Sequence, residues 1–240
     1  WLTIIDTVLV EVPRIVKAMR GVIAATVLLF AISIYSGWWL VSNFPELISL
    51  IASQEMIDTV ESGGLWTEGL LNIMPSSVLA ISIITNNVVV TLMAFILGAF
   101  YGLGTLYIIA MNGVMLGGVF AFTRLHGLDA GLFEFIIAHG VVELSVICLA
   151  GAAGVYLGEA LIRPGDRRRA DAFRSAVSRA ASLLLVAIPF LVGAGIIEGY
   201  VSPDAAISFA VKLATGLFYG VLFWYVLLGG FWSKIRTDSQ

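Results

Sequence analysis

The chain has 240 residues, of which 60% are hydrophobic and 12% are charged, and its formal net charge is −3. Because soluble domains carry roughly 25% charged residues, this composition excludes an ordinary soluble protein and indicates an integral membrane protein. The single cysteine, Cys148, excludes an intramolecular disulfide and any metal site built from several cysteines.

The N-terminal part of the chain combines a basic lead-in with a first membrane span. Residues 1–20 place apolar side chains at helical spacing beside Arg14, Lys17 and Arg20, which predicts an amphipathic helix on the cytoplasmic side of the membrane. Residues 22–41 form an apolar run that is long enough to cross a hydrocarbon core of ~30 Å. From residue 21 to residue 240 we expect a single transmembrane helical domain.

The next stretch, residues 42–84, contains five carboxylates and no Lys or Arg. Since cytoplasmic loops carry the excess of basic residues, we expect an acidic extracytoplasmic segment here, with surface-lying or partly inserted helices. The apolar run that follows, residues 88–122, is too long for one ordinary span. The sequence Gly102-Leu103-Gly104 predicts a turn inside it, and hence two spans over 88–101 and 105–122.

Three further spans complete the predicted bundle. They are residues 135–162, residues 181–200 with a kink expected at Pro189, and residues 207–231, followed by Lys234 and Arg236. The predicted fold is therefore all-α, a polytopic membrane helix bundle of about six spans with amphipathic surface helices. Five spans are the alternative if residues 88–122 are re-entrant, and a start of the second span before residue 88 is the alternative for its boundary.

The loop over residues 163–179 is the most basic part of the chain. Its basic residues are Arg163, Arg167, Arg168, Arg169, Arg174 and Arg179. Because basic residues mark cytoplasmic loops, we expect this loop to be cytoplasmic, and the span count places both termini on the same side. One interpretation is that the arginines only fix the topology. The other is that they form a docking surface for a cytoplasmic partner or for anionic membrane lipid.

Glycines recur at a spacing of four along the predicted spans. The pairs are Gly98/Gly102, Gly113/Gly117, Gly154/Gly158, Gly195/Gly199 and Gly216/Gly220. Small residues at this spacing let two helix backbones approach closely. The pattern predicts a tightly packed bundle, and one or two of these faces are candidates for a homodimer.

Polar residues that are costly at membrane depth converge on one level of the bundle. His139 and Glu143 are four residues apart and so share one face of a helix. Glu143 precedes Arg163 by 20 residues and Glu198 follows Arg179 by 19, which places both carboxylates roughly 30 Å from the cytoplasmic edge. The polar intramembrane cluster predicted from the sequence comprises Asn86, Asn87, His139, Glu143 and Glu198, and it also includes Asn112, which is placed there by the motif Asn112-Gly113 and not by its depth.

Three interpretations of this cluster compete. In the first, the side chains satisfy one another and fix the order of the helices. In the second, His139, Glu143 and Glu198 bind a divalent metal ion, since one imidazole and two carboxylates suit such an ion. In the third, the cluster binds a headgroup or envelope ligand in an outward-facing cavity. No zinc-protease, nucleophile-elbow or phosphate-loop motif is present, so we expect no enzymatic activity.

Several short motifs follow one another in a characteristic order. They are Thr85-Asn86-Asn87, Gly102-Leu103-Gly104-Thr105, Asn112-Gly113, Leu116-Gly117, His139-Gly140 with Glu143-Leu144, the small residues at 150–154, and Ile197-Glu198-Gly199-Tyr200-Val201-Ser202-Pro203. Together they resemble the stage II sporulation protein M family of bacterial and archaeal membrane proteins, over about residues 85–205. That family commonly has Pro before the His-Gly pair, where this chain has Ala138, so the helix break that a proline would cause is in doubt here.

The resemblance implies a multi-pass membrane protein without an established enzymatic activity. The founding members of the family act in engulfment during endospore formation and are linked to peptidoglycan-remodelling proteins. Many relatives resemble components encoded beside AAA-type ATPases and von Willebrand A-domain proteins.

We therefore predict a non-enzymatic scaffold or partner protein of a cell-envelope complex, in the cytoplasmic (inner) membrane of a prokaryote. AAA-type ATPases or von Willebrand A-domain proteins are the partners that the resemblance implies, and no nucleic acid is expected. The alternative is a transporter or an ion-binding membrane protein that uses the polar cluster, open to the outer side.

Overall fold

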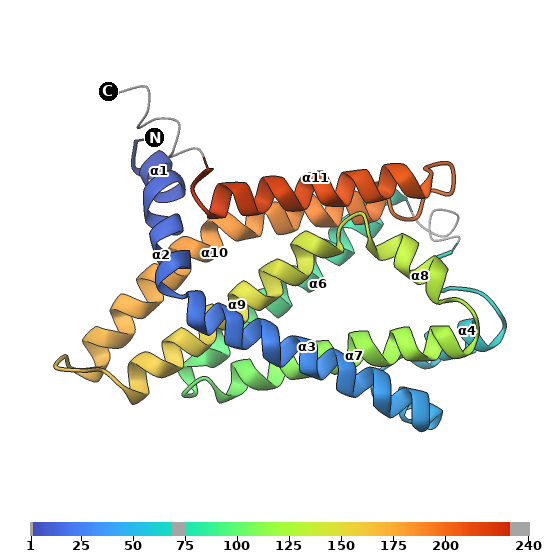
Figure 1. The fold of residues 1–240 in the computed structure, drawn as a ribbon, viewed down its shortest axis with the longest axis horizontal. Helices are drawn as coiled ribbons and strands as arrows, with labels where there is room; N and C mark the ends of the chain where they lie inside the picture. The colour runs from blue at the N-terminus through green and yellow to red at the C-terminus, as the bar shows by residue number, and fades with distance from the viewer. Residues whose placement is uncertain (1, 69–74, 231–240) are drawn as a thin grey trace.

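The computed structural model describes residues 2–68 and 75–230, and over these ranges the chain is helical without strands. Six of the described helices are long and apolar enough to cross a membrane, which confirms the predicted all-α bundle (Figure 1). They are α3 (Arg20–Asn43), α6 (Ser76–Ile96), α7 (Leu103–Leu125), α9 (Gly140–Ile162), α10 (Arg169–Tyr200) and α11 (Phe209–Leu227). The predicted end of the sixth span, at Phe231 with Lys234 and Arg236, lies outside the described residues.

Helix α6 begins well before the predicted start of its span. It starts at Ser76 rather than at Val88, so the last residues of the segment predicted over 42–84 already belong to a span. The polar residues in this stretch are compatible with a helix because their groups bond within it. The Thr85 hydroxyl, for example, donates to the carbonyl of Ile81 at 2.8 Å, and this removes much of the cost of a hydroxyl in an apolar run.

A tight turn joins α6 to α7, as the glycines predicted. A short 3-10 helix, Leu97–Ala99, ends α6, and Gly102 precedes α7 with φ at +80°. The left-handed conformation at this residue favours glycine. Across the turn, the Thr105 hydroxyl donates to the Ala94 carbonyl at 2.6 Å, which fixes the start of α7 against the end of α6.

Residues 135–162 do not form one continuous helix, which corrects the prediction. Helix α8 covers Asp129–Ile136, a turn follows, and α9 begins directly after His139. The packing of α11 accounts for part of this break. Gly216 lies so close to the backbone carbonyl of Ile137 that a side chain there would overlap with it, so the turn is held against α11 at its glycine.

Helix α10 starts earlier than its predicted span over 181–200. It begins at Arg169, so the basic loop predicted over 163–179 is non-helical only to residue 168, and the later arginines lie on the first turns of the helix. Pro189 lies inside α10, and the helix changes direction along its length in Figure 1. A proline inside a helix removes one backbone hydrogen bond and causes such a kink.

The N-terminal lead-in is helical and packs against the bundle. It consists of α1 (Leu2–Asp6), a π-helical stretch (Thr7–Glu11) and α2 (Val12–Ala18). Val12, Ile15 and Val16 of α2 are buried in the same apolar core as residues of α9, α10 and α11. The lead-in is therefore anchored in the protein along one face.

Two short helices cover the other end of the molecule. A 3-10 helix at Pro45–Leu50 and α4 (Gln54–Glu61) follow α3. The Ser53 hydroxyl caps α4 by accepting a hydrogen bond from the Met56 backbone N–H. The apolar side chains of both elements pack into a core with the end of α3 and of α7. The part of the acidic segment that is described thus folds back over the bundle.

Helix α9 is the centre of the bundle, with 67% of its most apolar stretch buried. The predicted close packing at glycines is confirmed, because all five pairs face other segments of the same chain. Gly98 contacts Gly154, Gly102 contacts Gly158, Gly113 and Gly117 contact α3, Gly195 and Gly199 contact α6, and Gly216 and Gly220 contact the turn before α9 and its first residues. A homodimer stays a prediction.

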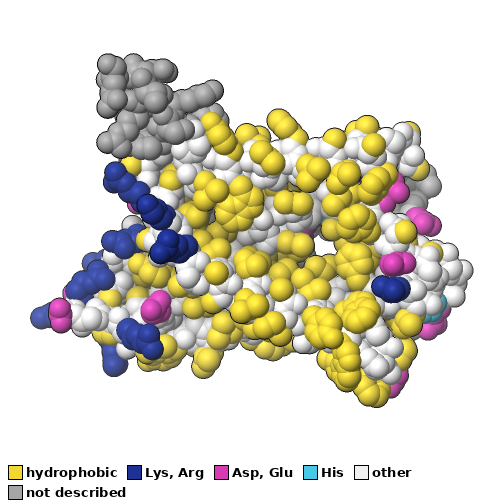
Figure 2. All heavy atoms as spheres, in the orientation of Figure 1, with side chains coloured by type: hydrophobic (Ala, Val, Ile, Leu, Met, Phe, Trp, Pro, Cys, Tyr) yellow, Lys and Arg dark blue, Asp and Glu magenta, His cyan; other side chains and the backbone are white. Residues whose placement is uncertain are grey.

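Charged side chains separate toward the two ends of the molecule. Figure 2 shows Lys and Arg gathered at the end where α2 and the α9–α10 turn lie, and Asp and Glu mostly at the opposite end, near α8. The surface between the ends is largely apolar in this view. This distribution matches a protein whose middle zone faces lipid and whose two ends face water.

Candidate functional site

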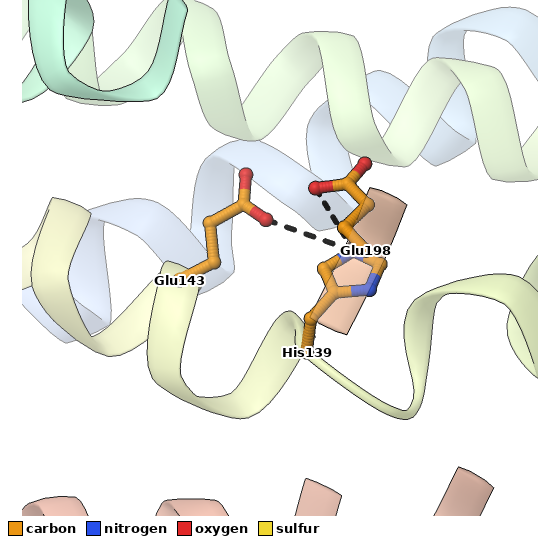
Figure 3. A group of neighbouring side chains, drawn as sticks. All are labelled: His139, Glu143 and Glu198. Carbon is orange, nitrogen blue, oxygen red and sulfur yellow. Dashed lines mark ion pairs between the residues drawn. The ribbon is translucent and has the colours of Figure 1, made fainter. Parts of the chain in front are cut away.

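The imidazole of His139 lies at the centre of the polar cluster. His139 precedes the first residue of α9, and its side chain is only 3% exposed. Its Nε2 atom is 3.6 Å from Oε2 of Glu143 and 3.6 Å from Oε2 of Glu198 (Figure 3). Both distances exceed those of ordinary hydrogen bonds, so the two carboxylates flank the ring without closing on it.

The break before α9 has a direct consequence for this geometry. Glu143 lies on the first turn of α9, whereas Glu198 comes from the last turn of α10. Gly199 lies against Ala80 of α6 so closely that a side chain there would overlap with it. The close approach of α10 and α6 thus fixes the helix that carries Glu198, while the turn at His139 directs the ring between the two carboxylates.

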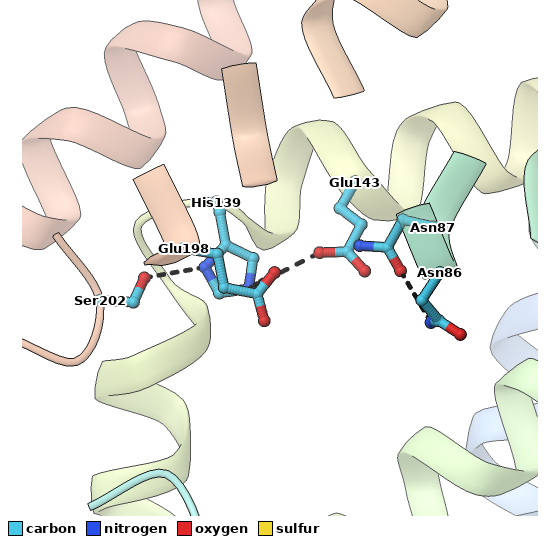
Figure 4. Close-up of polar contacts among 6 residues, drawn as sticks. All are labelled: Asn86, Asn87, His139, Glu143, Glu198 and Ser202. Atoms are coloured by element: carbon cyan, nitrogen blue, oxygen red, sulfur yellow. Dashed lines mark hydrogen bonds and ion pairs between the residues drawn. The ribbon is translucent and has the colours of Figure 1, made fainter. Parts of the chain in front are cut away.

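The opposite nitrogen of the ring is held by Ser202, a residue that the sequence prediction of the cluster missed. The Ser202 hydroxyl and His139 Nδ1 form a hydrogen bond of 2.9 Å, and Ser202 is 2% exposed (Figure 4). Ser202 lies four residues after Glu198, just past the end of α10. The sequence signal for Ser202 was its position one helical turn after Glu198. The direction of its hydroxyl toward His139 depends on the turn that follows α10, which the sequence does not show.

The two neighbouring asparagines extend the cluster on the α6 side. Asn87 is buried, and its side-chain amide lies beside the Glu143 carboxylate as a polar partner (Figure 4). The Asn86 amide donates in turn to the Asn87 side-chain oxygen at 3.3 Å. Asn112 does not join this network, because its amide donates to the Ile108 carbonyl of its own helix at 2.8 Å. The structure therefore connects five of the six predicted residues.

The three central residues form a donor set for a cation. The ligand atoms of His139, Glu143 and Glu198 all lie within 4.8 Å of one another. Within the described part of the chain, Oε2 of Glu198 is buried and lacks a hydrogen-bond partner. Since a buried carboxylate oxygen without a partner is costly, this arrangement is suited to a positively charged group placed between the three side chains. An imidazole and two carboxylates fit a divalent ion such as Zn²⁺ or Mn²⁺.

A cavity of about 410 Å³ reaches the cluster. His139, Glu143 and Glu198 supply ionisable groups to its wall, and most of the other lining side chains are apolar. Part of that lining, including Met56 and Trp66, comes from the acidic segment that follows α3. The cluster is therefore accessible from a cavity on the acidic side of the bundle.

The predicted arginine surface lies at the basic end of the bundle. In the sequence it stands between the two carboxylates of the cluster, with Arg163 20 residues after Glu143 and Arg179 19 residues before Glu198. All six arginines are exposed: Arg163, Arg167, Arg168, Arg169, Arg174 and Arg179. None of them forms an ion pair with a carboxylate among the described residues. Arg179 donates a hydrogen bond of 3.4 Å to the Tyr156 hydroxyl. The surface is therefore available for an anionic partner.

A family model described as stage II sporulation protein M matches residues 26–203. The chain belongs to the stage II sporulation protein M family. The matched region contains the complete cluster, from Asn86 to Ser202, and the arginine surface. It excludes α2 and α11, so these two helices are not accounted for by the family match.

Comparison with curated proteins and with solved structures gives no match for this family member. The family match and the six apolar helices agree that it is a multi-pass membrane protein.

Proposed function

We propose that this stage II sporulation protein M family member is a cation-binding membrane protein whose site is formed by His139, Glu143 and Glu198. The observation that carries the proposal is the buried Oε2 atom of Glu198, which lacks a hydrogen-bond partner and faces the His139 ring at 3.6 Å. Two carboxylates held beside one imidazole at low exposure are stabilised by a positive charge, and a bound ion would supply it.

The surrounding groups are arranged as supports for such a site. Ser202 holds Nδ1 of His139 and leaves Nε2 directed at the carboxylates. The Asn87 side-chain amide lies beside the Glu143 carboxylate as a polar partner. Partners of this kind orient the ligands of metal sites in proteins. The cavity beside the cluster supplies the entry path, and we infer that this path opens to the extracytoplasmic side, because the acidic segment lines it and basic residues gather at the other end.

The test measures how much metal the purified protein binds and how added metal changes its thermal stability. Elemental analysis after exposure to Zn²⁺ or Mn²⁺ is expected to give about one ion per chain for the wild type, and thermal stability is expected to rise with the added ion. The His139→Ala/Glu143→Ala variant should lose both effects. His126→Ala is the matched control, because this second histidine bonds the Phe122 carbonyl and lies away from the cluster.

Equal metal content and equal thermal shifts in the wild type and in the double variant would refute a divalent-metal site. The same pair of proteins in liposomes then tests transport, since ion uptake by the wild type alone distinguishes a transporter from a protein that only holds its ion. In either case the role that we propose is not enzymatic.

A second candidate function rests on the arginine surface at the basic end. Its six exposed side chains lack ion pairs among the described residues, which favours an acidic docking partner. A scaffold in a cell-envelope complex of the prokaryotic cytoplasmic membrane, with this surface and the termini cytoplasmic, is consistent with that feature. AAA-type ATPases and von Willebrand A-domain proteins are the partners to test.

The scaffold is tested by a pull-down with such candidate proteins. The triple variant Arg167→Gln/Arg168→Gln/Arg169→Gln should lose the partner while it keeps its thermal stability, because exposed side chains contribute little to folding. Unchanged recovery of the partner with this variant would exclude the arginine surface as the docking site.

A further inference from the structure

Helix α2 borders a groove that combines apolar walls with three cations. The groove has a volume of about 370 Å³. Its basic residues are Arg14, Lys17 and Arg20, and its apolar residues include Leu9, Val10, Val16 and Leu228. It therefore lies between the N-terminal lead-in and the end of α11, at the basic end of the bundle seen in Figure 2.

The buried face of α2 fixes the direction of two of the three cations. Val12, Ile15 and Val16 are buried in the main core, so α2 cannot rotate about its axis without exposing them. Arg14 and Lys17 are three residues apart on α2 and lie about 60° from one another around its axis, whereas Arg20 begins α3 after the break at Met19. All three are exposed, and among the described residues no carboxylate forms an ion pair with them.

A second groove, of about 280 Å³, lies on the other side of α2. Arg14 lines both grooves, and Arg179 and Tyr156 supply polar groups to the second one. Ile15 and Met19 give it an apolar wall. Glu11 also lines the second groove, so only the first groove combines an apolar wall with basic side chains and no carboxylate in its lining.

We propose that the groove bordered by Arg14, Lys17 and Arg20 is a binding site for an anionic phospholipid. The lipid phosphate pairs with the three cations, and an acyl chain lies along Leu9, Val10 and Leu228. A free phosphate ion would use only the cations, whereas the apolar wall of the groove matches a hydrocarbon chain. This inference concerns the opposite end of the molecule from the cation site and does not depend on it.

The experiment measures binding of phosphatidylglycerol, with phosphatidylcholine as the uncharged comparison, to the full chain in detergent micelles. One basic residue near an anionic lipid surface contributes roughly a five-fold change in affinity. The variant Arg14→Gln/Lys17→Gln/Arg20→Gln should therefore bind phosphatidylglycerol about 100-fold more weakly than the wild type. Arg167→Gln/Arg168→Gln/Arg169→Gln is the matched comparison, since it removes the same charge from the same end without touching the groove, and it should weaken the binding of phosphatidylglycerol much less than the first variant does.

A second variant keeps the charges and fills the groove. Val10→Trp should weaken the binding of phosphatidylglycerol without changing the charge of the protein, because its indole occupies the space of the acyl chain. Equal loss in both triple variants would show that the net charge of the basic end, and not the groove, attracts the lipid, and would overturn the proposal. Normal binding by both the α2 triple variant and Val10→Trp would also overturn it, as would full displacement of the lipid by millimolar inorganic phosphate.

Discussion

The hydrogen bond between Ser202 and His139 provides the sharpest test of how the polar cluster is held. Ser202→Ala leaves Nδ1 of His139 without its partner at 2.9 Å. The two residues are 2% and 3% exposed, so the bond between them is buried. The loss of one partner of a buried hydrogen bond costs about 1–3 kcal/mol, and we expect the free energy of unfolding to fall by that amount.

The same substitution should also affect ion binding if the cluster is a cation site. A residue that orients a metal ligand typically contributes about 10–100-fold to metal affinity, so Ser202→Ala should weaken the binding of Zn²⁺ or Mn²⁺ by about that factor. Unfolding by SDS in mixed micelles, followed by tryptophan fluorescence, gives the stability, and the shift of thermal stability with added ion gives the affinity.

Ser33→Ala is the matched control for this prediction. Ser33 is also buried, but its hydroxyl donates to the Leu29 carbonyl of its own helix at 2.8 Å, where removal has little effect. If Ser202→Ala and Ser33→Ala have equal stability and equal ion affinity, the hydrogen bond to His139 does not hold the ring, and the account of the cluster given above is wrong.

Two further predictions concern packing and charge. Glu134→Ala should lower the free energy of unfolding by about 3 kcal/mol, because it leaves the buried Lys212 ammonium without its partner at 3.2 Å. Lys212→Met should lower the free energy of unfolding by less than about 1 kcal/mol, because Glu134 is 42% exposed and water can replace the lysine. Equal losses of stability for the two variants in SDS unfolding would contradict this asymmetry. Gly199→Val should cost about 1–3 kcal/mol by overlap with Ala80 of α6. It should also abolish ion binding, since it displaces the neighbouring carboxylate of Glu198, and unchanged metal content would argue against that coupling.

Composition and charge predicted the class of fold and the approximate number of spans, because both depend on the length of apolar runs and on the distribution of Lys and Arg. The start of α6 before Val88 was predicted only as the alternative boundary, and the reason is physical. Serine, threonine and asparagine lower the apparent hydropathy before Val88, yet a helix can accommodate such side chains: the Thr85 hydroxyl bonds to the preceding turn at Ile81, and Asn86 bonds to Asn87. The sequence alone does not show that such a polar side chain finds its hydrogen-bond partner within its own helix.

The candidate site was predicted better than its local backbone. The depth estimated along the helices predicted that His139, Glu143 and Glu198 lie at one level of the bundle. In the structure their ligand atoms lie within 4.8 Å of one another. The break before α9 was not predicted, since Ala138 offers no proline there and the contact with Gly216 is made by a distant helix. Asn112 was placed in the cluster by the motif alone, but its amide bonds within α7.

The proline in α10 gives the cluster an adjustable element. Pro189 leaves the carbonyl of Leu185 without its usual partner in the helix, so the two halves of α10 are joined by a weakened hinge. Glu198 lies nine residues beyond it, which makes the second half a lever of roughly 13 Å. A change of about 10° in the bend would move the Glu198 carboxylate by about 2 Å, more than half of the 3.6 Å that separates it from His139. The contact of Gly199 with Ala80 of α6 opposes this motion, so a change of bend would open or assemble the ligand set only where α6 moves together with the second half of α10.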